Sequence, residues 1–146
     1  MKKIILLGFF AIAFNYGYAQ PNVEQLIIGN KVFGTHWIKP YGSATIIKQH
    51  DSILIRGSQV RGTDYCTIKG AIKLIDARNF EFTGSISLKY LFDRNNLLTV
   101  DKDEKVLTGK FLFRRIKDRK YWRLKQPESA TGYFDHAYHY IDIFMD

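Results

Sequence analysis

The sequence is poor in cysteine and proline, and both shortages restrict the possible folds. Cys66 is the single cysteine among 146 residues, so no disulfide can form within the chain. Only three residues are proline while 15% are aromatic, a composition that argues against a disordered chain. The fold must therefore be held by a hydrophobic core, which a single domain of this length is able to bury.

The chain also lacks an apolar run long enough to span a bilayer. Its longest run, residues 4–14, follows the basic start at residues 1–3 and precedes the small residue Ala19. This order is typical of a secretory signal peptide. We therefore predict a signal peptide over residues 1–19 and one exported domain over residues 20–146, in the periplasm or outside the cell, with no transmembrane segment.

Acidic residues are the third shortage. The chain has 22 basic and 14 acidic residues, and loss of Lys2 and Lys3 with the signal peptide leaves 20 basic residues against the same 14. A basic exported protein meets anionic lipids, lipopolysaccharide, teichoic acids or acidic glycans. The same excess also serves solubility, and composition alone leaves both interpretations open. We expect no nucleic-acid partner.

Alternation of apolar and polar residues is the strongest pattern present, and it is typical of half-buried strands. It is clearest over residues 64–91, where two runs flank a turn at residues 76–79 in which Asn79 is able to take a left-handed conformation. Matching the apolar faces predicts three cross-strand pairs: Leu74 with Phe80, Ile72 with Phe82, and Gly70 with Gly84. The facing glycines leave a gap that either permits a sharp bend or makes space for a ligand.

Further strands are expected over residues 32–38, 44–49, 52–58, 106–116, 121–125 and 138–145. Residues 97–100 form a short apolar piece between polar turns, and residues 22–28 are the one candidate for a helical turn. About eight short strands joined by hairpins indicate an all-β fold. We expect a single antiparallel meander β-barrel, with a β-sandwich as the alternative, because closing the sheet removes exposed edges.

A basic hairpin is the strongest candidate for a binding site. Residues 114–125 contain seven basic residues together with Tyr121 and Trp122. Basic residues pair with phosphate or carboxylate groups, and aromatic rings stack on ligands. In the expected hairpin, Arg114 lies opposite Arg123 on the outer side, as either an anion site or a solvated strip.

Arg115 and Trp122 are expected to face each other on the inner side of the same hairpin. A guanidinium stacked on the indole would contribute about 0.5–2 kcal/mol and close the end of the barrel. Tyr133 and Phe134 lie in the long loop at residues 126–137. They are candidates for a contact loop or lid, or for a plug at the barrel end.

Catalytic and metal-binding patterns are not recognisable in the sequence. Cys66 is expected on the inner face of its strand, where a free cysteine behaves as a small hydrophobe. His139 and Asp142 would point to opposite faces of a strand, so with Asp135 and His136 they do not form a convergent metal site. We therefore predict no catalytic residue, metal ion or cofactor.

Four stretches resemble a group of small exported bacterial β-proteins of unknown function: YCTIKG at 65–70, FEFTG at 80–84, RKYWRL at 119–124 and YIDIF at 140–144. The signal peptide resembles those of Bacteroidetes. The strand layout is similar to that of the lipocalin-like calycins, which implies an eight-stranded ligand-binding barrel. The Gly-x-Trp of that family is absent, because Gly34 and Trp37 stand further apart.

The sequence thus predicts a non-enzymatic binding module for a lipid-like ligand in an apolar interior or for an anionic envelope component at the basic face. The alternative is a protein-interaction module, such as a hydrolase inhibitor, that acts through residues 126–137. A third possibility is an enzyme of unknown type. The oligomeric state is left open. The candidate ligand-binding residues are Arg114, Arg115, Trp122, Arg123, Tyr133 and Phe134.

Overall fold

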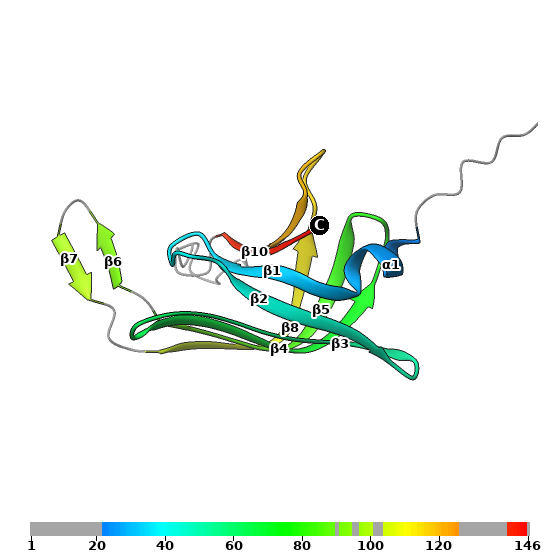
Figure 1. Ribbon diagram of the computed structural model, residues 1–146, viewed down its shortest axis with the longest axis horizontal. Coiled ribbons are helices and arrows are strands. Elements are labelled where there is room, and N and C mark those ends of the chain that lie inside the picture. The colour runs from blue at the N-terminus through cyan, green and yellow to red at the C-terminus, as the bar shows by residue number, and fades with distance from the viewer. Residues whose placement is uncertain (1–21, 90, 95–96, 101–103, 126–139, 146) are drawn as a thin grey trace, which may run out of the picture.

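The chain folds into a closed, eight-stranded antiparallel barrel (Figure 1). The computed structural model describes residues 22–89, 91–94, 97–100, 104–125 and 140–145. The strands follow one another around the barrel in chain order, and β10 closes the circle by pairing with β1. The predicted all-β meander barrel is therefore confirmed, and the sandwich alternative is wrong.

The barrel strands are β1 (Gly29–Thr35), β2 (Gly42–Gln49), β3 (Ser52–Arg61), β4 (Asp64–Leu74), β5 (Asn79–Lys89), β8 (Lys105–Arg114), β9 (Tyr121–Leu124) and β10 (Ile141–Phe144). Between β5 and β8, strands β6 (Leu91–Arg94) and β7 (Leu97–Val100) pair only with each other in a separate sheet. The sequence analysis missed β6, because Asp93 and Arg94 are typical turn residues.

Helix α1 (Val23–Ile27) confirms the predicted helical turn and lies beside one end of the barrel (Figure 1). It begins after Asn22, whose Oδ1 accepts a hydrogen bond from the backbone N–H of Glu24 at 3.1 Å. Ile27 is fully buried in the barrel core. The Glu24 carboxylate also accepts a hydrogen bond from Lys48 Nζ on β2 at 2.7 Å. Leu26 and Ile28 also pack against the core, so apolar contacts and one ion pair on the surface attach the helix to the barrel.

The three predicted pairs between β4 and β5 are all present. The gap at Gly70 and Gly84 is filled by the ring of Phe82, because a Cβ added at Gly70 would lie 2.6 Å from Phe82 Cε2. A Cβ added at Gly84 would lie 2.8 Å from Phe82 Cζ. The glycines therefore make space for an aromatic ring of the protein itself at this level of the barrel.

Aromatic side chains from neighbouring strands fill the barrel beside this point. The rings of Phe80 and Phe113 stack with centroids 5.0 Å apart, and Trp122 meets Phe80 edge-on at 5.9 Å. Phe82 meets Phe113 edge-on at 6.1 Å. These four side chains are at most 1% exposed, so they form the centre of the hydrophobic core.

The predicted turn at residues 76–79 is present and depends on Asp76. Its Oδ1 accepts hydrogen bonds from the backbone N–H groups of Arg78 and Asn79 at 2.7 and 2.9 Å. Hydrogen bonds from the Asn79 side chain, followed by that from the Arg78 backbone, lower the pKa of Asp76. Asn79 does not adopt the left-handed conformation that its residue type permits. Asn79 begins β5 instead, and positive φ angles occur in other hairpin turns, at His50 (54°) and Lys117 (49°).

A buried glutamine joins β3 to the connection between β1 and β2. Gln59 Oε1 accepts a hydrogen bond from the Thr35 N–H at 2.7 Å, and Nε2 donates to the carbonyls of Ile38 at 2.7 Å and Pro40 at 2.9 Å. Gly34 makes this arrangement possible, because a Cβ built there would collide with the Gln59 amide. Gly34 also has a φ of 149°, which side chains disfavour.

We predict that Gly34→Ala lowers the free energy of unfolding by about 2–5 kcal/mol, since backbone strain and overpacking each cost about 1–3 kcal/mol. Gly29→Ala is the matched control, because Gly29 has a φ of 116° but no atom within 4 Å of an added Cβ. Urea unfolding followed by tryptophan fluorescence measures both variants. Equal losses would show that the collision with Gln59 has no energetic effect.

Candidate anion-binding site

A basic cleft lies where the turn between β4 and β5 meets the hairpin of β8 and β9. Its volume is about 500 Å³. The described residues of its lining are basic, amide and apolar, and none of them is acidic. The basic residues of the lining are Arg78, Arg114, Arg115, Lys117, Arg123 and Lys125. Three of the predicted ligand-binding residues, Arg114, Arg115 and Arg123, are thus brought together in one cleft.

Strand pairing explains why these cations converge. Arg114 pairs with Asn79 on one side and with Arg123 on the other, as the hairpin pattern predicts for the two arginines. The backbone N–H of Arg115 donates a hydrogen bond to the Arg78 carbonyl at 2.7 Å. Like charges directly opposite each other on neighbouring strands are destabilising. The cleft therefore places positive charges close together at an energetic cost.

Arg123 is neutralised by a buried carboxylate. Its Nε and Nη2 donate hydrogen bonds to the two carboxylate oxygens of Asp142, each at 2.7 Å. Asp142 is 2% exposed, and the Arg123 side chain is 22% exposed. Hydrogen bonding to Asp142 raises the pKa of Arg123 against the opposing effect of burial. The Arg123 guanidinium also lies 4.8 Å from the ring centroid of Tyr121 and 4.4 Å from that of Tyr140.

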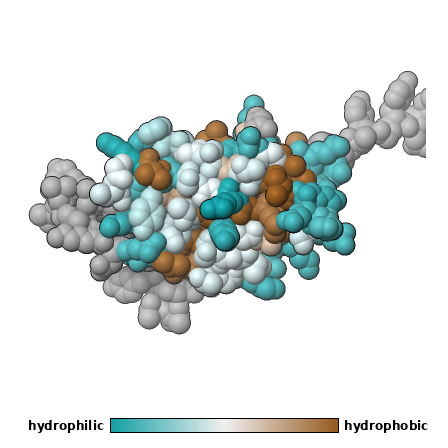
Figure 2. Space-filling model, turned by 60° about the horizontal axis from the view of Figure 1, so that its bottom comes forward, coloured by the Kyte–Doolittle hydropathy of each residue, from teal (hydrophilic) through white to brown (hydrophobic). Residues whose placement is uncertain are grey.

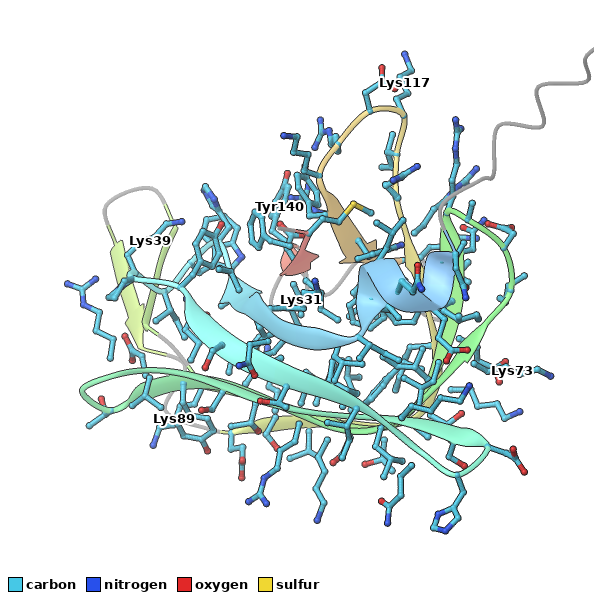
Figure 3. All side chains as sticks on the ribbon, turned by 45° about the vertical axis from the view of Figure 1, so that its right-hand side comes forward. Lys31, Lys39, Lys73, Lys89, Lys117 and Tyr140 are labelled. Carbon is cyan, nitrogen blue, oxygen red and sulfur yellow. The ribbon has the colours of Figure 1, made fainter. Side chains whose placement is uncertain are left out.

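The other cations of the cleft have no such partner. Within the described residues, no hydrogen bond or ion pair involves the side chain of Arg78, Arg114, Lys117 or Lys125. Lys117 stands at the tip of the hairpin, as Figure 3 shows. Asp76 interacts electrostatically with Arg78, but none of the described residues that line the cleft is acidic, so positive charge there is available to an external anion.

Arg115 and Trp122 do not form the predicted stack. Trp122 is 1% exposed and packs into the core against Phe80, so the indole does not reach the cleft. In the described part of the chain, the cations that lie over aromatic rings are Lys39, Arg119 and Arg123. Arg115 instead directs Nη1 towards Met145 Sδ at 3.6 Å, and its buried Nε has no hydrogen-bond partner among these residues.

Several other sequence predictions lie outside the described residues. Tyr133 and Phe134 belong to this group, as do Asp135, His136 and His139. Asp142, the remaining member of the weak metal-binding pattern, uses both carboxylate oxygens to bind Arg123. Within the described ranges, no group of three or more residues is placed to hold a metal ion.

Cys66 occupies the inner face of β4, as its place in the alternation predicted. The side chain is fully buried, and this desolvation raises the thiol pKa to about 12. The thiol is therefore protonated at neutral pH, and burial keeps reagents away from it.

Among the helices of the described residues, none has the length and apolar character needed to cross a membrane.

Comparison with known proteins relates the chain to a family. The model of the PM1083 family matches residues 18–145. An uncharacterised protein of Pasteurella multocida, PM1083, is 33% identical over 126 residues, which cover 84% of this chain and 76% of that protein. No solved structure matches the chain. The chain belongs to the PM1083 family, so the expected membership in a family of uncharacterised proteins is confirmed.

We predict that Asp142→Asn lowers the free energy of unfolding by about 3 kcal/mol, because it leaves a half-buried guanidinium without its counter-charge. Glu81→Gln is the control, since its ion pair with Lys110 spans 3.4 Å and the lysine side chain is 70% exposed. Such surface pairs contribute roughly 0–1 kcal/mol. Urea unfolding compares the two variants, and similar losses would contradict a special role for the Arg123–Asp142 pair.

We also predict that Cys66 does not react with a thiol-specific disulfide reagent at pH 8 while the protein is folded. The thiol should react completely in urea, because unfolding exposes it and restores its ordinary pKa. Absorbance of the released chromophore measures the reaction. Thr63→Cys supplies an exposed thiol on the same chain as a positive control. Rapid labelling of Cys66 without urea would contradict its burial.

Proposed function

We propose that this member of the PM1083 family is an exported, non-enzymatic binding module that holds an anionic component of the cell envelope in its basic cleft. The proposal depends on the charge of the cleft, because six of the described residues that line it are basic and none is acidic. Among the described cations of the lining, Arg123 is the one that has a buried carboxylate partner. An anion bound beside Arg114 gives that arginine the counter-charge that Arg123 obtains from Asp142.

The arrangement suits a ligand with two or more phosphate or carboxylate groups. Guanidinium groups bind such anions through paired hydrogen bonds, while lysines add charge with less directional preference. The Nε of Arg115 is buried without an acceptor, and a bound anion is one source of that acceptor. The volume of about 500 Å³ lies within the usual range of small-molecule sites.

A lipid-like ligand inside the barrel has less support, because aromatic rings of the protein fill the interior around Phe82. The likeness to lipocalin-like calycins is supported by the closed eight-stranded meander. Export is supported by the signal-peptide pattern of residues 1–19 and by a family match that begins at residue 18. The alternative role in protein binding depends on residues 126–137, outside the described ranges.

The proposal predicts that pyrophosphate binds to the purified protein and that Arg114→Ala/Lys125→Ala weakens this binding at least tenfold, or about 1.4 kcal/mol. Raising the salt concentration should also weaken it, because exposed charges are screened. Isothermal titration calorimetry measures both effects. Lys89→Ala is the control: Lys89 ends β5, whereas Asn79 in the cleft begins it, and Figure 3 shows Lys89 far from Lys117.

Absence of pyrophosphate binding by the folded wild-type protein would contradict the proposal. So would equal affinity of the wild type and the double variant. The double variant removes two charges and Lys89→Ala removes one. A loss of binding free energy in Lys89→Ala that is half the loss in the double variant would therefore indicate that total charge, rather than the cleft, attracts the anion. Thermal unfolding of each variant confirms that the proteins being compared are folded.

A further inference from the structure

The outer face of β2, β3 and β4 contains three parallel rows of residues with different chemistry. Cross-strand pairing defines each row, and adjacent rows are two residues apart along each strand, or about 7 Å. One row carries hydroxyl groups, the middle row carries two cations, and the third is apolar. In that order the rows are Ser43, Ser58 and Thr67; Thr45, Arg56 and Lys69; and Ile47, Leu54 and Ala71.

Two hollows lie on this face and meet at the middle row. A hollow of about 650 Å³ extends over the apolar row, and one of about 450 Å³ extends over the hydroxyl row. Thr45, Arg56 and Lys69 line both. Figure 2 looks onto this side of the barrel and shows a hydrophilic group near its centre with hydrophobic surface beside it. The two cations therefore separate an apolar hollow from a polar one.

The cationic row has no counter-charge in the described structure. Arg56 and Lys69 are direct cross-strand partners, and no hydrogen bond or ion pair to a described residue involves either side chain. Like charges in this position are destabilising. Ile47, in the next row, is 48% exposed. Unpaired cations next to exposed apolar surface are complementary to a molecule with an anionic end and an apolar end.

We infer that this face binds an amphiphile with a single alkyl chain and an anionic head group. The alkyl chain lies along Ile47, Leu54 and Ala71, and the head group lies between Arg56 and Lys69. Hydroxyl groups of the row formed by Ser43, Ser58 and Thr67 donate further hydrogen bonds to the head group. The inference is independent of the basic cleft, because the two sites share no lining residue.

The test is a titration of the full-length, isotope-labelled protein with decyl phosphate below its micelle concentration, followed by backbone amide chemical shifts. We expect saturable shifts centred on β2, β3 and β4. Decyl maltoside, which has the same chain but a neutral head, and inorganic phosphate, which has no chain, should each bind at least tenfold more weakly. If decyl maltoside binds as tightly as decyl phosphate, the site does not require an anionic head group. If inorganic phosphate binds as tightly, the site does not require an alkyl chain. Either result would overturn the inference.

Two variants locate the site without relying on a loss of folding. Arg56→Gln/Lys69→Gln should weaken decyl phosphate binding at least tenfold while maintaining or raising the unfolding temperature, since it removes a like-charge contact. Ile47→Ser should weaken binding by shortening the apolar contact. Arg114→Ala/Lys125→Ala should leave the decyl phosphate affinity unchanged. If this last variant alone lost binding, decyl phosphate would be assigned to the basic cleft, and the inference would be overturned.

A final experiment distinguishes binding of a single amphiphile molecule from docking of the face on a lipid membrane. The protein is mixed with vesicles of neutral phosphatidylcholine containing one-fifth phosphatidylglycerol and sedimented. Binding to these vesicles without any saturable response to monomeric decyl phosphate would show that the face docks on membranes, and would overturn a site for a single amphiphile. Saturation by the monomer at one molecule per chain supports it.

Discussion

The buried ion pair between Arg123 and Asp142 stands where the barrel closes. Strand β10 has four residues, and it must pair with β9 on one side and β1 on the other. Asp142 and Ile143 each have a partner on both sides, and Asp142 lies opposite Arg123 and Gly34. A carboxylate that is 2% exposed is tolerated only with a counter-charge and full hydrogen bonding. Arg123 supplies both, so the closing strand depends on it.

This same pairing determines which charges remain available for binding. Arg114 and Arg123 are neighbours in one row of the barrel wall, but only Arg123 has a carboxylate beside it. Arg114 is left facing the cleft with its charge unpaired. On the face of β2, β3 and β4, Arg56 and Lys69 are similarly opposed without an acid among the described residues. Cations without an acidic partner among the described residues thus lie at two surfaces, and we assign an anionic group to each.

Much of the fold follows from local pattern, and the register of β4 and β5 shows why. Its apolar faces alternate with period two and a short turn joins them, so a slip by one residue would expose every apolar side chain. Strand β6 was missed because its backbone pairing outweighs the turn preference of Asp93 and Arg94. The hydrogen bonds of Gln59 were not predicted, because its partners at residues 35–40 lie at the end of β1 and in the segment before β2, far from Gln59 in the sequence. The predicted stack of Arg115 on Trp122 does not form, because the indole packs into the core.

The sequence by itself determined the strand periodicity, the meander order, the opposition of Arg114 to Arg123 and the burial of Cys66, because each depends on neighbouring residues or on one hairpin. Only the tertiary structure decided that Asp142 neutralises Arg123, that Phe82 fills the space at Gly70 and Gly84, and that Gln59 binds the segment after β1. The physical reason is that closing the sheet brings together strands far apart in the chain. Burial then requires each enclosed polar group to find a partner among those new neighbours.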